Sequence, residues 1–244
     1  MSHPRALITG AARRIGAQIA RQLHTAGYDL ILHYRQSADD ATQLCDELNK
    51  LRDNSCTCIQ ADLEQMGQVE QLAQKVKASG SLELLVNNAS SFYPTPVGDV
   101  SQKDWDALIN SNLRAPFFLT QALYPLLKST GGCVINLIDV HAERGLAGYP
   151  VYSIAKAGLK MMTLSLAREL APEVRVNGIA PGPILWPEAE AALSKEARQA
   201  VVDKTVLART GRPQDIADAV LYLANAGYVT GQVLAVDGGR SLYS

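Results

Sequence analysis

The feature that most constrains the fold is a regular alternation of short apolar runs with longer amphipathic segments along all 244 residues. Short, nearly continuous apolar runs are typical of strands that are buried on both faces of a parallel sheet. We expect such strands at residues 5–9, 29–34, 57–61, 82–86, 133–138, 174–179 and 232–236.

The segments between these runs have helical periodicity. Ile15, Ile19 and Leu23 recur at a spacing of four residues, which places them on one face of a helix. Ser101 and Asp104 have the spacing of a capping box at the start of another helix. The repeated strand–helix order predicts the α/β class, as one doubly wound Rossmann-type domain over residues 1–244 with a seven-stranded parallel sheet.

Charge and hydropathy exclude several classes of partner. The chain has 23 Lys and Arg against 24 Asp and Glu, a net charge of -1, and no long run of like charge. We therefore expect neither a nucleic-acid partner nor an anionic membrane surface. Because there is neither a long apolar stretch nor a basic segment followed by an apolar one at the start, we expect a cytoplasmic protein without a membrane span.

The cysteines and histidines do not form a metal-binding pattern. Cys45, Cys56, Cys58 and Cys133 include no C-x-x-C pair, and the four histidines are scattered. We therefore expect reduced, structural thiols and no metal site.

A long insertion at about residues 183–212 separates the sixth predicted strand from the last predicted helix. It carries Trp186 and an Ala/Glu-rich segment of helical character. Connections of this length are usually functional, so we expect a substrate lid. The alternative is a surface excursion without a role.

Residues 9–16, Thr-Gly-Ala-Ala-Arg-Arg-Ile-Gly, follow the first strand and open the first helix. Gly10 permits a tight turn, Gly16 permits close packing of the helix, and free N–H groups at the helix start can bind a pyrophosphate. This stretch resembles the T-G-x-x-x-G-x-G turn of short-chain dehydrogenases, with Arg14 in the place of the middle glycine. Arg14 can pair with the pyrophosphate and reach the substrate; otherwise it is a solvated surface side chain.

The end of the second strand predicts the choice of nicotinamide cofactor. An NAD enzyme would have Asp or Glu there, whereas this chain has Arg35 and Ser37. Together with Arg13 they can neutralise the 2′-phosphate of NADP(H). We therefore expect NADPH/NADP.

Further segments match the family's cofactor site. Asp62 and Leu63 match its adenine contact, residues 87–90 match its N-N-A-G segment with Ser90 in place of the glycine, and residues 181–182 match its nicotinamide contact. The resemblance assigns to cofactor binding Gly10, Arg13, Arg14, Ile15, Arg35, Ser37, Asp62, Leu63, Asn88, Ala89, Ser90, Tyr152, Lys156, Pro181 and Gly182.

Tyr152 and Lys156 form the family's Y-x-x-x-K pair, on one face of a helix. We expect the Lys156 charge to lower the pKa of Tyr152 from about 10, so that Tyr152 donates a proton. Asn112 matches the asparagine that helps to hold a relay water near the lysine. Asp139 stands where the catalytic serine is usual; an aspartic acid beside a tyrosine suits a basic ring nitrogen that must receive a proton, and an inactive relic is the competing explanation.

These departures, with residues 88–96 (Asn-Ala-Ser-Ser-Phe-Tyr-Pro-Thr-Pro), make the chain similar to pteridine reductases and their bacterial dihydromonapterin-reducing relatives. The resemblance implies NADPH-dependent reduction of dihydropterins, and often of oxidised pterins and dihydrofolate. Phe92 would stack on the pterin ring, or else be plain core. The implied substrate-binding residues are Arg14, Ser90, Phe92, Asp139, Tyr152, Pro183 and Trp186.

The resemblance also implies a homotetramer. Two other functions stay open at this point. A reductase for an oxoacyl group or sugar ketone would share the cofactor motifs but would have serine at position 139, and a non-catalytic NADP(H)-sensing module would not need Tyr152 and Lys156.

Overall fold

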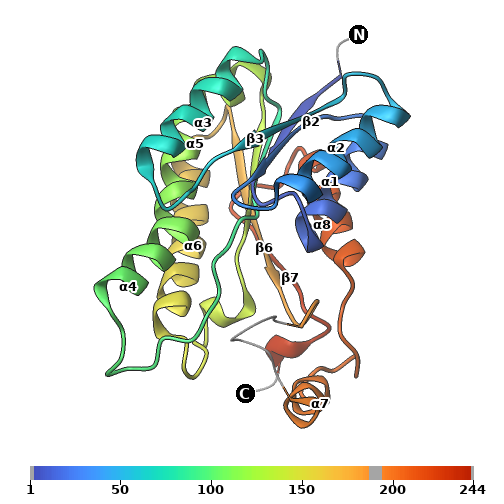
Figure 1. The fold of residues 1–244 in the computed structure, drawn as a ribbon. Helices are drawn as coiled ribbons and strands as arrows, with labels where there is room; N and C mark the ends of the chain where they lie inside the picture. The colour runs from blue at the N-terminus through green and yellow to red at the C-terminus, as the bar shows by residue number, and fades with distance from the viewer. Residues whose placement is uncertain (1–2, 187–193, 243–244) are drawn as a thin grey trace.

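The computed structural model describes residues 3–186 and 194–242. Its described part contains one seven-stranded sheet in the order β3-β2-β1-β4-β5-β6-β7, in which every neighbouring pair is parallel (Figure 1). The predicted doubly wound sheet is confirmed, and each strand end lies within two residues of its predicted place. The strands are β1 (Arg5–Ile8), β2 (Asp29–Tyr34), β3 (Cys56–Gln60), β4 (Leu84–Asn87), β5 (Cys133–Leu137), β6 (Arg175–Pro181) and β7 (Val233–Val236).

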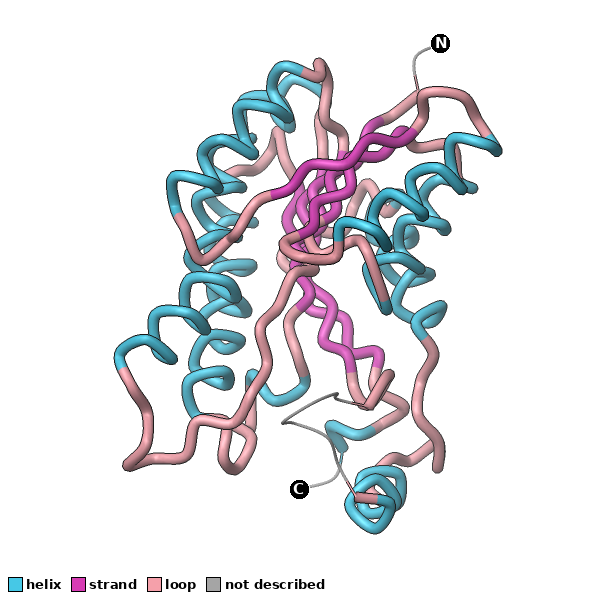
Figure 2. Tube along the Cα trace, viewed as in Figure 1, coloured by secondary structure: helices cyan, strands magenta, loops and turns pink. Residues whose placement is uncertain are grey.

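Helices cover both faces of the sheet, as Figures 1 and 2 show. Helices α1, α2 and α8 lie on one side, and α3, α5 and α6 lie on the other. Successive residues of β1 point to opposite sides: Ala6 and Ile8 belong to the apolar layer under α1 and α8, whereas Leu7 belongs to the layer under α3 and α5. The helices are α1 (Arg14–Thr25), α2 (Ala38–Leu51), α3 (Met66–Ala78), α4 (Gln102–Ile109), α5 (Ala115–Thr130), α6 (Pro150–Glu169), α7 (Lys195–Asp203) and α8 (Pro213–Asn225).

The strand order reverses beside β1, because β2 lies on one side of it and β4 on the other. In doubly wound sheets the crevice outside the carboxyl ends of the strands at such a point binds the ligand. The loops that follow β1, β4, β5 and β6, together with the start of α1, carry most of the predicted site residues, so the fold brings them to one edge of the sheet.

Two local expectations concern helix termini and the insertion. Ser101 accepts a hydrogen bond from the Asp104 N–H and the Asp104 carboxylate accepts one from the Ser101 N–H, which confirms the capping box at α4. Helix α7 lies within the insertion, but most of the Ala/Glu-rich segment, residues 187–193, falls outside the described residues. The described helices include none that is long and apolar enough to cross a membrane.

Candidate active site

The turn after β1 depends on two glycines and one unusual arginine. Gly10 has a φ of 63°, and a Cβ atom there would lie 2.9 Å from the Ala89 Cα. A Cβ on Gly16 would lie 2.2 Å from the Gly10 carbonyl oxygen. Arg14, in the place of the family's middle glycine, has a φ of 56°, in the left-handed region that favours glycine. The turn therefore keeps a glycine-like backbone while it adds a charged side chain.

The buried His33 of β2 fixes this turn. Its Nδ1 accepts a hydrogen bond from the Gly10 N–H at 3.1 Å, so its Nε2 carries the proton and donates to the Ala61 carbonyl at 3.0 Å. Burial lowers the pKa of His33 to about 4. The ring is neutral at pH 7 and joins β1, β2 and the end of β3. The sequence analysis missed this role.

Asn88 holds the same turn from β4. Its side-chain amide donates to the Thr9 and Gly10 carbonyl oxygens at 2.9 and 3.0 Å. In return, the Thr9 hydroxyl accepts from the Asn88 and Ala89 N–H groups, both at 3.0 Å. Asn88 and Ala89 thus stabilise the turn by hydrogen bonds, and both residues also line the adjacent cleft.

A cleft of about 400 Å³ opens above this turn. It is lined by all the residues that the resemblance assigns to the cofactor, except four that line a second cleft. The two clefts share Arg14, Ile15, Asn88 and Ser90. The four in the second cleft are Tyr152, Lys156, Pro181 and Gly182.

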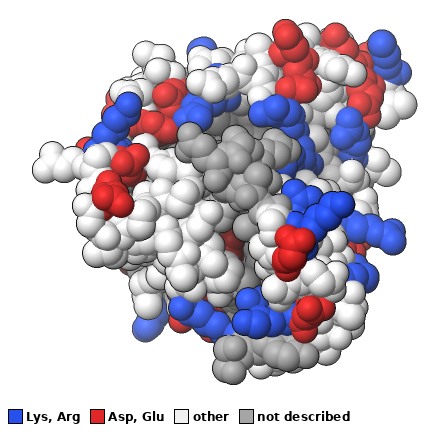
Figure 3. All heavy atoms as spheres, turned by 60° about the horizontal axis from the view of Figure 1, so that its bottom comes forward, with Lys and Arg blue, Asp and Glu red and all other residues white. Residues whose placement is uncertain are grey.

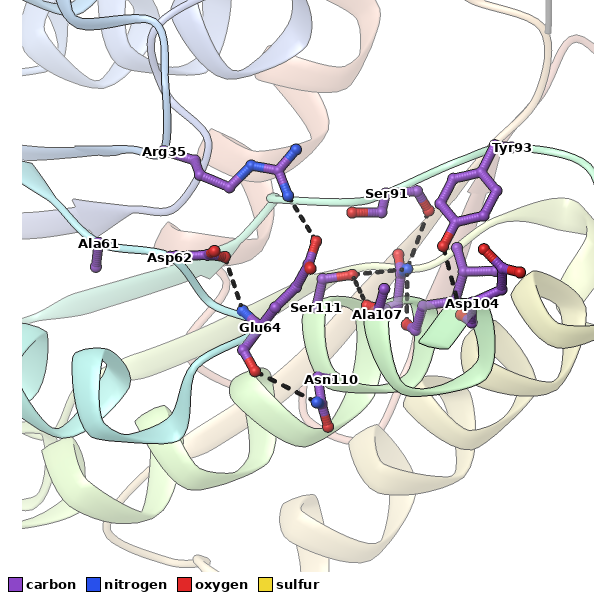
Figure 4. A network of polar contacts seen from close by, with 12 residues as sticks. Arg35, Ala61, Asp62, Glu64, Ser91, Tyr93, Asp104, Ala107, Asn110 and Ser111 are labelled. Atoms are coloured by element: carbon purple, nitrogen blue, oxygen red, sulfur yellow. Dashed lines mark hydrogen bonds and ion pairs between the residues drawn. The ribbon is translucent and has the colours of Figure 1, made fainter. Parts of the chain in front are cut away.

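Both arginines expected at the 2′-phosphate are already paired. The Arg35 Nη1 lies 2.5 Å from the Glu64 Oε1, and the Arg13 Nε lies 3.7 Å from the Asp40 Oδ2. Figure 4 shows Arg35 and Glu64 reaching toward one another from two different segments. The sequence analysis missed both acidic partners, because their contacts join separate elements.

The second cleft, of about 560 Å³, brings together all the residues expected to bind substrate. Figure 3 shows the face of the molecule below β6, β7 and α7, on which basic and acidic side chains are interspersed. Further lining residues that the sequence analysis missed include His141, Leu146, Tyr149, Leu185, Val201 and Arg240.

Asp139 follows β5 and holds the hydroxyl of Tyr152. Its Oδ2 accepts a hydrogen bond from the Tyr152 hydroxyl at 2.8 Å, and its Oδ1 accepts one from the His141 N–H at 2.8 Å. The buried Lys156 donates to the Leu137 carbonyl at 2.9 Å and lies 5.6 Å from the centre of the Tyr152 ring. The two carboxylate oxygens therefore bind different groups: Oδ1 orients the backbone at His141, and Oδ2 orients the Tyr152 phenol.

This geometry corrects the expected acidity of Tyr152. Burial and the Asp139 carboxylate raise the pKa of Tyr152 well above 10, because a carboxylate that accepts from the phenol stabilises its neutral form. Burial lowers the pKa of Lys156 to about 8. The prediction that Lys156 lowers the pKa of Tyr152 is wrong for this structure, since the ammonium group lies against the ring and a carbonyl oxygen.

Asn112 lies in a π-helix, Asn110–Arg114, between α4 and α5. It is fully buried; its amide donates to the Ser91 and Leu108 carbonyl oxygens at 3.0 and 2.9 Å, and its Oδ1 accepts from the Ser90 hydroxyl at 2.6 Å. Among the described residues, these hydrogen-bond partners do not include Lys156. The structure thus joins Asn112 to the loop of Ser90, and its predicted relay water stays a prediction.

Phe92 is part of an aromatic cluster in the second cleft. Its ring stacks on Tyr149 with a centroid distance of 4.6 Å and an angle of 9°, and it meets Tyr152 edge-on at 4.8 Å. Tyr149 therefore covers one face of Phe92. Tyr149 is the N-cap residue of α6 and lies outside the helical turn, so helical spacing alone could not have placed it.

Trp186 borders the cleft on the side of the insertion. Arg14 Nη2 donates to its carbonyl oxygen at 3.0 Å, and the Arg198 guanidinium of α7 lies 5.5 Å from the centre of its ring. Pro183 lines the same cleft. Trp186 thus contacts both the start of α1 and α7 of the same insertion, whereas movement of the insertion as a lid stays a prediction.

The Cys, His, Asp and Glu side chains of the described residues include no group of three or more placed to hold a metal ion. The four cysteines are free thiols, three of them buried. Burial raises the pKa of Cys133 to about 11 and that of Cys58 to about 12.

Comparisons with known proteins show the family to which the chain belongs. A family model described as enoyl-(acyl carrier protein) reductase matches residues 10–241. Pteridine reductase 1 of Leishmania tarentolae is 35% identical, with 98% of this chain and 96% of the relative covered. Dihydromonapterin reductase of Enterobacter sp. strain 638 is 35% identical (97% and 96% covered), and 3-oxoacyl-(acyl-carrier-protein) reductase of Staphylococcus aureus strain Mu50 is 36% identical (96% of each).

A solved structure has the same fold. The crystal structure of a blue fluorescent protein from a metagenomic library, in complex with NADPH, superposes with a TM-score of 0.89 at 36% identity and covers 97% of both chains. The chain therefore belongs to the short-chain dehydrogenase/reductase family, in which it is similar to the pteridine reductases.

Proposed function

We propose that this protein reduces a pteridine, a dihydropterin foremost, with NADPH as the reductant. The observation that carries the proposal is Asp139, which holds the Tyr152 hydroxyl at 2.8 Å in a cleft that also contains the aromatic ring of Phe92. A flat heterocycle with a basic ring nitrogen matches both features, because it needs a stacking partner and a proton donor.

The residues of the first cleft fit NADPH. The contacts at Gly10 and Gly16 leave no room for a Cβ, which is the close backbone cradle that a pyrophosphate at a helix start needs. Arg13 and Arg35 supply positive charge at the side where the 2′-phosphate would lie. When bound, NADPH supplies a hydride, and the crystallised relative carries this same cofactor.

The protein's own residues manage the proton. Tyr152 keeps its proton at neutral pH because its pKa is well above 10, so it is a donor rather than a base. Asp139 orients the hydroxyl. Lys156, beside the same ring, has a pKa of about 8 and is therefore protonated at neutral pH. In a dihydropterin this set would protonate N5 while C6 gains the hydride, as a coupled group rather than as independent acids.

A ketone reductase is the second candidate, because a 3-oxoacyl-(acyl-carrier-protein) reductase is as similar in sequence as the pteridine reductase. Against it stands Asp139, at the place where such a reductase would have a neutral hydroxyl. A non-catalytic NADP(H) sensor is the third candidate, and the Asp139, Tyr152 and Lys156 arrangement opposes it.

The deciding experiment is a substrate panel of 7,8-dihydrobiopterin, dihydromonapterin, dihydrofolate, biopterin and a simple oxoacyl thioester, each with NADPH. We expect a dihydropterin to give the highest kcat/KM, and Asp139→Ser to depress pterin reduction more than any side activity on ketones. The proposal fails if the thioester exceeds every pterin by about tenfold, a transition-state preference of about 1.4 kcal/mol. The homotetramer and the cytoplasmic location stay predictions.

A further inference from the structure

The cofactor cleft contains an acidic side chain where a phosphate would have to bind. Glu64 lines the cleft together with Arg35, and its carboxylate lies 2.5 Å from the Arg35 Nη1. A 2′-phosphate that pairs with Arg35 must share its guanidinium with this carboxylate. The first cleft therefore offers less net positive charge than its arginines alone indicate.

The position of Glu64 is determined by backbone contacts on both sides, which Figure 4 shows. The Glu64 N–H donates to the Asp62 carboxylate at 3.0 Å, and the Glu64 carbonyl oxygen accepts from the Asn110 side chain at 3.3 Å. The side chain of Glu64 is 25% exposed, against 46% for Arg35. The backbone of Glu64 is thus held on both sides, and its side chain is the less exposed member of the pair.

Electrostatics decide the direction of the effect. A guanidinium has five N–H donors, so Arg35 can bind a phosphate and a carboxylate together, but the two anions then repel one another. NADH has a neutral hydroxyl in the place of the phosphate, and a hydroxyl can donate a hydrogen bond to a carboxylate. Glu64 therefore opposes NADPH and does not oppose NADH.

We propose that Glu64 is a specificity-determining residue that lowers the preference of this enzyme for NADPH over NADH by neutralising Arg35. Of the proposed function, this inference assumes only that NADPH is the cofactor. Because the pair is partly exposed, the effect is moderate and decreases with added salt.

The test is Glu64→Gln, which keeps the shape of the side chain and an oxygen that can accept from Arg35. Dissociation constants of NADPH and NADH are measured by fluorescence titration at low salt. We expect NADPH to bind about threefold to tenfold more tightly and NADH to bind no more tightly than to the wild type, with a smaller difference at high salt.

The matched control is Glu47→Gln, which removes a surface carboxylate that accepts two hydrogen bonds from Arg21 at 2.8 Å, away from the cleft. It should change neither dissociation constant by more than about twofold. Arg35→Gln should weaken NADPH by about tenfold and spare NADH, since it removes the cation itself.

An unchanged NADPH to NADH affinity ratio in Glu64→Gln overturns the inference, and so does weaker NADPH binding, which would mean that Glu64 chiefly orients Arg35 for the phosphate. These results leave the proposed function intact as long as the wild type binds NADPH. A wild type that binds no NADPH overturns both.

Discussion

The Asp139 carboxylate changes the acid–base character of the residues around it. It accepts a hydrogen bond from the Tyr152 hydroxyl at 2.8 Å, and burial together with this carboxylate raises the pKa of Tyr152, whereas Lys156 faces the ring. Tyr152 therefore starts each turnover as a neutral acid held by an anion. The rate should consequently depend on its hydroxyl, while cofactor affinity should depend on the glycine turn.

Tyr152→Phe should reduce kcat by at least about 100-fold, the loss expected of a missing general acid. NADPH affinity should stay within about twofold of the wild type, because we expect the glycine turn, and not the phenol, to be the main anchor of the cofactor. Steady-state kinetics and a fluorescence titration measure the two quantities. Near wild-type turnover would mean that Asp139 delivers the proton without Tyr152.

Phe92→Ala should raise the pterin KM by about tenfold, because it removes the ring on which the substrate stacks. Tyr149→Ala should raise KM as well, since Tyr149 supports Phe92 from its other face at 4.6 Å. Tyr149→Phe keeps this ring and serves as the matched control, with KM near that of the wild type. Equal KM values for Phe92→Ala and the wild type would exclude Phe92 from substrate stacking.

Among the elements, β2 contributes more than a layer of the core, because its His33 supports the loop that follows β1. The ring accepts from Gly10 and donates to Ala61, and both bonds need the neutral form with its proton on Nε2. Protonation would place a second proton on Nδ1 and break the bond to the turn. Acid should therefore act on the cofactor cleft through His33, which lines the cleft and supports its glycine turn.

The pH dependence of stability tests this role. The pKa of His33 falls from 6.5 when unfolded to about 4 when folded, so the unfolded chain binds more protons between these values. This contribution is fully present above pH 6.5 and is lost as the pH falls toward 4, by about 3 kcal/mol in all. Chemical unfolding of the wild type and His33→Asn between pH 4 and 7 should show a steeper slope for the wild type; parallel slopes would contradict the assignment.

The sequence predicts the elements well, and the contacts between them poorly. Strand positions and the Ser101 capping box follow from local periodicity and spacing, so they could be predicted. The Phe92–Tyr149 stack and the Arg35–Glu64 pair join distant segments, and only packing determines which of many polar or aromatic residues meet. The error on the pKa of Tyr152 has the same origin: the motif gives the helix face but neither the burial of the phenol nor its hydrogen bond to Asp139.

At the scale of the whole molecule, large apolar side chains remain exposed on the α5 and α6 side. They include Phe117 and Phe118 of α5 and Ile154 and Met161 of α6, between 37% and 63% exposed. Exposed apolar side chains of this size, where they form a patch, often mark an association site.

The predicted homotetramer can be checked directly. Sedimentation velocity at micromolar concentration should give a single species of four chains, because association would cover these side chains. A monomer at that concentration would remove the prediction, and Phe118→Ser should shift the distribution toward smaller species if this side of the molecule takes part.

Helix α4, the π-helix and α5 follow one another without a break over residues 102–130. The π-helix introduces an angular offset between α4 and α5 within a single turn. An i→i+5 turn holds one residue more than an α-turn, and one residue corresponds to about 100° of rotation about the axis. The corresponding faces of α4 and α5 therefore point in different directions. Leu119 and Leu123 of α5 pack in the apolar layer against the sheet. Helix α4 instead contacts the loop of Phe92, because the Asp104 carbonyl oxygen accepts a hydrogen bond from the Tyr93 hydroxyl. Deleting one residue from 110–114 would bring the two helices into phase and turn α4, with the loop that it contacts, away from the cleft.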